Sequence, residues 1–149
     1  SDDWPQGMPQ ASLRAFRSVL EQDWRQTIED FIWLQVRGSQ RADEVVASLQ
    51  AAMQSHGEPR HEALLAGMRM LESIDLRDTA AHVTQPVLLI TGRNDRVTSP
   101  QAAEWLAETM PQATLKVLPR AGHAPQLSHV QDVAEAIQAF LAANAQVGS

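Results

Sequence analysis

Residues 86–97 read PVLLITGRNDRV, and this stretch decides the fold class. Its first half is a continuous apolar, β-branched run between Pro86 and Gly92. Such a run is typical of a strand buried on both faces, as in a parallel sheet covered by helices. The polar segment that follows the run places Asp95 just beyond the expected end of the strand.

A second strand and two helices are expected downstream. Ser99 and Pro100 predict the cap and the first position of an amphipathic helix. A second strand is expected at 114–118, and Ser128 or His129 is expected to begin the last helix. The order strand–helix–strand–helix predicts two right-handed crossover units of a parallel sheet, and therefore an α/β fold. Two strands alone would leave a sheet edge uncovered, so something must complete the sheet.

Upstream of Pro86 the pattern is helical. Residues 1–9 contain two prolines and a glycine and predict an irregular lead-in. From about Gln10 to Ser73, apolar residues recur at three- and four-residue steps and predict four helices joined by short loops. Within this part, Gly38 is expected to stop the second helix, and Ser39 is a candidate cap for the third.

The candidate catalytic residues follow the two expected strands. Asp95 follows the first strand, and His123 follows the second within Ala121-Gly122-His123-Ala124-Pro125. Reacting groups collect at the carboxyl ends of parallel strands, and adjacent strands lie about 4.8 Å apart. The carboxylate could therefore orient the imidazole, and the imidazole could act as a general base. Each residue alone could equally be a turn or surface-loop residue.

Composition excludes several classes of protein. The 149 residues contain no cysteine and carry a net charge of -6, which argues against disulfides and against binding to nucleic acid or an anionic membrane. No apolar run approaches the roughly 20 residues of a membrane span, and the first residues do not resemble a signal peptide. No histidine or carboxylate spacing resembles a metal site, so we expect neither metal nor cofactor. We expect a cytoplasmic protein.

The segments Gly92–Val97 and Gly122–Pro125 resemble the acid loop and the histidine loop of the α/β-hydrolase family. In that family the triad runs nucleophile, acid, histidine along the chain. The resemblance implies a helical cap at 1–76, with its lead-in, and the last two β-α units of the hydrolase core at 77–149. No Gly-x-Ser-x-Gly occurs in the sequence. The chain therefore resembles the C-terminal half of such an enzyme, without nucleophile or oxyanion hole, and is expected to be inactive alone.

A narrower resemblance is to the carboxylesterases of biotin synthesis, a branch of this family. It rests on Asp3-Trp4-Pro5, Asp23-Trp24 with Thr27 and Glu29, Phe31–Gln35, Ile74–Arg77, and His123–Pro125 with Ser128-His129. It implies a serine esterase that removes the methyl ester from a pimeloyl chain on acyl carrier protein. It also implies that an acyl pocket is lined by Phe31, Ile32, Trp33, Leu34 and Gln35. Plain packing of these residues within the cap is the alternative.

Two other functions stay open. Related α/β-hydrolases use the same acid and histidine for C–C bond, lactone, peroxide or halide reactions. A helical interaction module without chemistry would instead leave Asp95 and His123 too far apart to bond. The expected partners are an ester substrate, possibly linked to acyl carrier protein, and either the missing N-terminal half of the hydrolase or a second copy of the chain.

Overall fold

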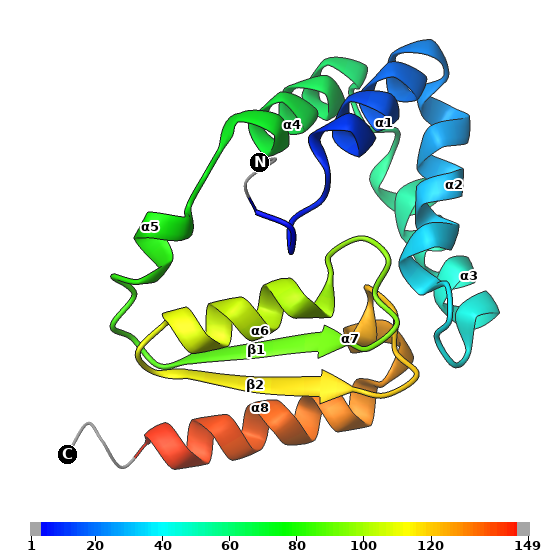
Figure 1. Ribbon diagram of the computed structural model, residues 1–149. Coiled ribbons are helices and arrows are strands. Elements are labelled where there is room, and N and C mark those ends of the chain that lie inside the picture. Colours follow the sequence, from blue (N-terminus) through cyan, green and yellow to red (C-terminus); the bar gives the residue numbers. More distant parts are fainter. Residues whose placement is uncertain (1–3, 146–149) are drawn as a thin grey trace.

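The computed structural model describes residues 4–145, in which a helical region precedes a strand region (Figure 1). The helical region consists of α1 (Gln10–Gln22), α2 (Trp24–Val36), α3 (Ala42–His56) and α4 (His61–Ser73), which confirms the four predicted helices. Asp3 of the Asp-Trp-Pro motif lies outside the described residues. Within the described part, no helix is long and apolar enough to cross a membrane.

The strand region contains both predicted strands and both predicted helices. Its elements are α5 (Arg77–Ala80), β1 (Val87–Gly92), α6 (Pro100–Thr109), β2 (Ala113–Leu118), α7 (Pro125–Ser128) and α8 (Val130–Asn144). β1 and β2 are parallel, with Val87 opposite Ala113 and Gly92 opposite Leu118. Figure 1 shows α6 and α8 on opposite sides of the two strands. The arrangement is the α/β order that the sequence predicts.

Burial of β1 differs from the prediction. Only Thr91 and Gly92 are buried, whereas the apolar residues 87–90 are half-buried. Within residues 4–145, β1 pairs with β2 alone, so its other edge has no strand beside it. A strand needs neighbours on both edges and helices on both faces to be fully covered. The apolar run therefore has the composition of a central strand, but within residues 4–145 it has a strand on one edge only.

Two helix starts also differ from the prediction. Ser39 does not cap α3, because the cap position is Arg41, whose φ of 60° is left-handed. The Ser39 hydroxyl instead accepts a hydrogen bond from the Gly122 N–H. The last helix, α8, begins at Val130, one or two residues after the expected start, and the short helix α7, which was not predicted, precedes it. A four-residue helix is too short for a periodic pattern to predict.

The hydrophobic core joins the two regions. Ile32 and Val36 of α2 pack with Val45 and Val46 of α3, and Ala124 of the strand region completes this cluster. Ala124 is the residue directly after His123 and is 3% exposed. Burial of apolar surface of this kind is the main force that stabilises a fold. The segment that carries His123 is therefore anchored in the core of the helical region.

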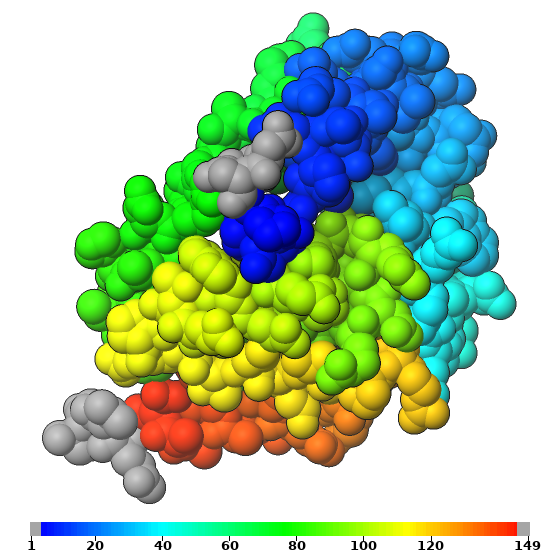
Figure 2. Space-filling view, in the orientation of Figure 1, coloured from blue at the N-terminus to red at the C-terminus, as the bar shows by residue number. Residues whose placement is uncertain are grey.

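The lead-in packs against α6 and the end of the acid loop. Ser99 caps α6 as predicted, since its hydroxyl oxygen accepts a hydrogen bond from the Ala102 N–H at 3.2 Å. The same hydroxyl donates to the Gln6 carbonyl at 2.7 Å. The rings of Trp4 and Trp105 pack edge to face, with their centroids 5.4 Å apart. Figure 2 shows residues 4–9 of the lead-in, in dark blue, against this part of the strand region.

Candidate active site

Asp95 and His123 meet at the carboxyl ends of the two strands. Asp95 Oδ2 lies 2.9 Å from His123 Nδ1, a hydrogen-bond distance. The Asp95 side chain is 4% exposed, whereas that of His123 is 32% exposed. The acid is thus enclosed and the imidazole is open to a reacting group. This contact contradicts the interaction-module hypothesis, which required the two side chains to be too far apart to bond.

The strand ends explain why the two loops meet. Beyond the sheet, the Arg93 N–H donates to the Leu118 carbonyl and the Asn94 N–H donates to the Ala121 carbonyl, both at 2.9 Å. Gly92 allows this close approach. A Cβ on Gly92 would lie 2.2 Å from the Gly122 carbonyl oxygen and 2.3 Å from that of Ala121. Glycine at the end of β1 therefore lets the acid loop and the histidine loop lie in backbone contact.

The Asp95 carboxylate is fixed by its own loop. Oδ1 accepts from the Val97 N–H at 2.8 Å and from the Thr98 N–H at 2.9 Å. Oδ2 accepts from the Thr98 hydroxyl at 2.9 Å, and that hydroxyl lies 3.3 Å from His123 Nδ1. This is the turn in which an aspartate accepts from the backbone two and three residues later. Thr98 is not among the candidate residues predicted from the sequence, although Asp-x-x-Thr is the local signal for such a turn.

These contacts set the charge of the acid. Burial acts to raise the pKa of Asp95, but hydrogen bonds from His123, Thr98 and Val97 outweigh it and hold the pKa below its ordinary value. The carboxylate is therefore ionised at neutral pH and accepts only. His123 Nδ1 then carries the proton that it donates to Asp95. Nε2 becomes the basic nitrogen, and it has no hydrogen-bond partner among residues 4–145.

The lowered pKa predicts how stability depends on pH. A carboxyl group whose pKa is lower in the folded than in the unfolded chain, where it is about 3.9, stabilises the fold above that value. This contribution is lost as the pH falls through the folded pKa. We expect the loss of unfolding free energy below about pH 4 to be smaller in Asp95→Asn than in the wild-type chain. Urea unfolding at several pH values measures it.

The control for this prediction is Asp132→Asn, which removes an exposed carboxylate at the first turn of α8. We expect it to follow the wild-type curve closely. Equal pH dependence in wild type and Asp95→Asn would contradict the role of Asp95 as a stabilising ionised group.

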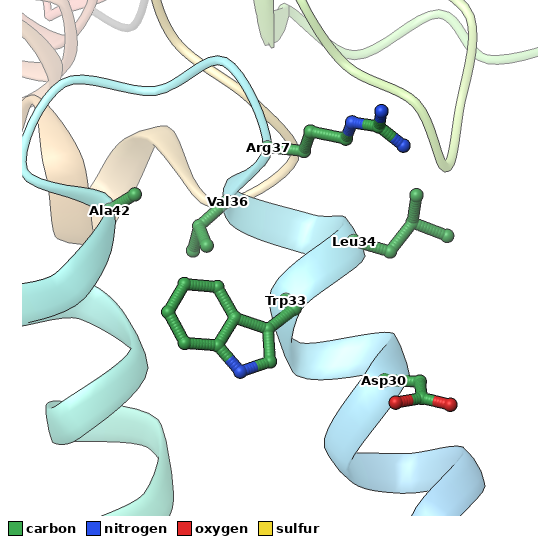
Figure 3. Close-up of a pocket in the computed structure, with 6 residues that line it drawn as sticks. All are labelled: Asp30, Trp33, Leu34, Val36, Arg37 and Ala42. Carbon is green, nitrogen blue, oxygen red and sulfur yellow. The ribbon is translucent and has the colours of Figure 1, made fainter.

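The expected acyl-pocket residues do not share one face. A pocket of about 490 Å³ lies beside α2. In Figure 3, Trp33 and Val36 point toward α3, whereas Leu34 and Arg37 point away from it. A second pocket, of about 520 Å³, lies between α1 and α2 and includes Phe31 and Leu34. Neither pocket includes Asp95 or His123.

The other two residues of that run have different positions. Ile32 is 4% exposed and belongs to the core, and it lines neither pocket. Gln35 accepts a hydrogen bond through its backbone carbonyl from the His123 N–H at 2.7 Å. Trp33 is 49% exposed. The run therefore combines core packing, an exposed surface and a direct contact with the histidine loop.

Within residues 4–145 the site holds an oriented base, but no nucleophile lies beside it. No serine hydroxyl in the described part contacts His123 Nε2. No group of three histidine, aspartate or glutamate side chains among residues 4–145 could hold a metal ion. Chemically, the arrangement can withdraw a proton from a hydroxyl brought to Nε2 and return it to a leaving group.

Comparison with known proteins gives a consistent result. Residues 11–127 match the family model described as serine aminopeptidase, S33. A pimeloyl-[acyl-carrier protein] methyl ester esterase from Nitrosomonas europaea is 42% identical over 126 residues, which cover 85% of this chain and 50% of that protein. An enzyme with the same name from Stenotrophomonas maltophilia is 39% identical, over 95% of this chain and 55% of its own length. The chain therefore spans about half the length of these relatives.

Solved structures agree on the fold. An esterase from Exiguobacterium antarcticum superposes with a TM-score of 0.81 at 19% identity, over 94% of this chain and 51% of the esterase. A bromoperoxidase from Bacillus anthracis superposes with a TM-score of 0.82 at 20% identity, over 95% of this chain and 52% of that structure. At such identities the similarity concerns the fold alone.

Proposed function

The chain belongs to the α/β-hydrolase family, in the group described as serine aminopeptidase S33, and we propose that it supplies the acid and the base of a serine carboxylesterase. The observation that carries the proposal is the hydrogen bond between Asp95 and His123 at the ends of two parallel strands. In this proposal Asp95 orients His123 and stabilises its cation. His123 Nε2 takes the proton of a serine hydroxyl as it attacks the ester carbonyl, and later protonates the leaving alcohol.

We propose that the nucleophile comes from a hydrolase half outside this chain. The strand edge of β1 is unpaired in the described part, and large apolar side chains are exposed on two surfaces. They are Met70 and Leu71 in the last turn of α4, Ile74 and Leu76 after it, and Leu127, Val130, Ile137 and Leu141 on α7 and α8. Exposed apolar surfaces of this kind mark interfaces. Residues 1–76 would then form the cap and residues 77–149 the end of the catalytic core.

For the substrate, we propose a pimeloyl-type methyl ester, as in the names of the relatives. The pocket lined by Phe31 and Leu34 between α1 and α2 would accept the acyl chain. Attachment of this ester to acyl carrier protein is a further part of the proposal, and the charge of the cap bears on it. The cap holds 7 arginines against 12 carboxylates, and three of the arginines pair with Glu72, Glu58 and Glu44. Such a surface attracts an acidic carrier weakly.

A cytoplasmic location, also part of the proposal, fits a chain that contains no cysteine.

A chimera tests the function. In it, this chain replaces the matching C-terminal half of the Nitrosomonas europaea relative, whose own N-terminal half brings the remaining catalytic groups. We expect the chimera to hydrolyse monomethyl pimelate thioester on acyl carrier protein, and the isolated chain to stay at the background rate. Because His123 is the proposed base, His123→Gln in the chimera should lower kcat by about 1,000-fold or more.

Substrate choice is checked with the same chimera. Comparable kcat/KM for a free methyl ester and the carrier-linked ester would support the esterase and contradict the carrier as a partner. A chimera whose activity survives His123→Gln, or an isolated chain that turns over p-nitrophenyl butyrate, would overturn the proposed division of the site.

A further inference from the structure

We propose that the loop between α2 and α3, residues 37–41, positions the catalytic histidine, and that Ser39 is the side chain through which it acts. The inference rests on the proposed role of His123 as the base. It makes Ser39 a positioning residue, because its contact is with the backbone beside His123 and not with the reacting atoms.

The histidine loop is hydrogen-bonded to the end of α2 and to the loop that follows. Three bonds join them: Gly122 N–H to Ser39 Oγ at 2.7 Å, His123 N–H to the Gln35 carbonyl at 2.7 Å, and Gln40 N–H to the Arg120 carbonyl at 3.1 Å. Two consecutive amides, those of Gly122 and His123, are therefore held by the helical region. Fixing these two successive peptide groups fixes the backbone at Gly122 and the position of the His123 Cα, from which the side chain starts.

The same loop also holds the acid loop. The Asn94 side-chain amide donates to the Gly38 carbonyl at 2.8 Å. Gly38 has a φ of 79°, and a Cβ there would lie 3.1 Å from the Asn94 Cβ. Asn94 directly precedes Asp95 in the chain. The 37–41 loop thus bridges the two segments whose separation sets the distance between Asp95 and His123.

Packing leaves the histidine loop little freedom to move. Ala121 is 0% exposed and Ala124 is 3% exposed, so the residues on both sides of Gly122 and His123 are buried. A Cβ on Gly122 would lie 2.6 Å from the Gln35 carbonyl oxygen. Of this segment, the His123 side chain alone is directed outward, with 32% of its surface exposed.

Ser39 is the one partner of these two amides that a substitution can remove, because Gln35 accepts through its backbone. Ser39→Ala leaves the buried Gly122 N–H without its acceptor, whereas Ser39→Thr keeps a hydroxyl in place. Ser48→Ala is the matched control, because within the described residues Ser48 bonds only the Glu44 carbonyl, on the exposed face of α3.

The first experiment uses NMR spectroscopy of the complete chain. In Ser39→Ala we expect the Gly122 amide to exchange about tenfold faster or more, and the ring nitrogen signals of His123 to move toward those of a histidine without an acid partner. Ser39→Thr and Ser48→Ala should both resemble the wild type. Unchanged His123 ring signals in a folded Ser39→Ala chain would overturn the inference.

The second experiment measures catalysis in the chimera. Ser39→Ala should lower kcat about tenfold with little change in KM, and Ser39→Thr should restore most of it. A lower melting temperature with unchanged kcat would show that Ser39 only stabilises the fold, and would overturn the inference. If Ser39→Ala does not fold, Asn94→Ala takes its place, and unchanged His123 signals in that variant count against the inference. A wild-type chimera without esterase activity refutes the proposed function, while the NMR result still decides the positioning.

Discussion

Replacement of Asp95 by asparagine is expected to lower kcat of the chimera, in the proposed esterase reaction, by about 10,000-fold, the effect of converting the orienting acid of a triad to an amide. The structure explains why the loss is so large. The Val97 and Thr98 amides donate to Oδ1 and hold an oxygen at that position. The new amide nitrogen must therefore occupy the position of Oδ2, which is 2.9 Å from His123 Nδ1.

A nitrogen at that position reverses the role of the imidazole. Because the amide donates, Nδ1 must accept, and the proton of neutral His123 moves to Nε2. A protonated Nε2 cannot take a proton from the proposed serine nucleophile, so the base is lost while the geometry is kept. The measurement is kcat in the chimera at neutral pH, with Asp132→Asn as the control. A loss of less than about tenfold would contradict the assignment of Asp95 as the orienting acid.

The sequence predicts the parts of the site that depend on local pattern. Strand β1 follows from one apolar run, and Asp95 and His123 stand directly after the two strands, where a parallel sheet brings its loops together. Their hydrogen bond could therefore be expected from spacing alone, although it joins residues 28 positions apart.

The supporting contacts could not be predicted in the same way. The bond between Gly122 and Ser39 joins residues 83 positions apart, and no periodicity relates a helix–helix loop to a strand-end loop. Gly38 and Ser39 carry the local signals of a helix stop and a helix cap, so the sequence pattern predicts only these local roles for them. Tertiary packing instead uses the Ser39 hydroxyl to accept from a glycine of another region.

The acyl-pocket run shows a second limit of the sequence. Consecutive residues of a helix point in different directions, so five residues in a row cannot line one cavity. In the structure Ile32 enters the core, whereas Phe31 and Leu34 reach the groove between α1 and α2. The apolar character of the run could be recognised from sequence, but its division between core and pocket depends on which helices lie alongside α2.

Gly92→Ala is expected to destabilise the fold by about 3 kcal/mol, which is at the upper end of the usual effect of overpacking. The added Cβ would lie 2.2 Å from the Gly122 carbonyl oxygen and 2.3 Å from that of Ala121. Both contacts are with backbone, so no flexible side chain can turn aside. The histidine loop must move away from β1, and the Asp95–His123 hydrogen bond lengthens with it.

Gly67→Ala is the matched control for this substitution. Gly67 lies within α4, and a Cβ there would meet nothing within 4 Å. Alanine is favoured over glycine inside a helix by about 0.5–1 kcal/mol, so this variant should be slightly more stable than the wild type. Urea unfolding of the three chains measures both effects. Opposite signs for the same chemical change would show that contact between the two loops, and not glycine as such, sets the requirement at Gly92. Equal stability of Gly92→Ala and the wild type would show that the loops have room to separate, and would contradict the close backbone contact at the site.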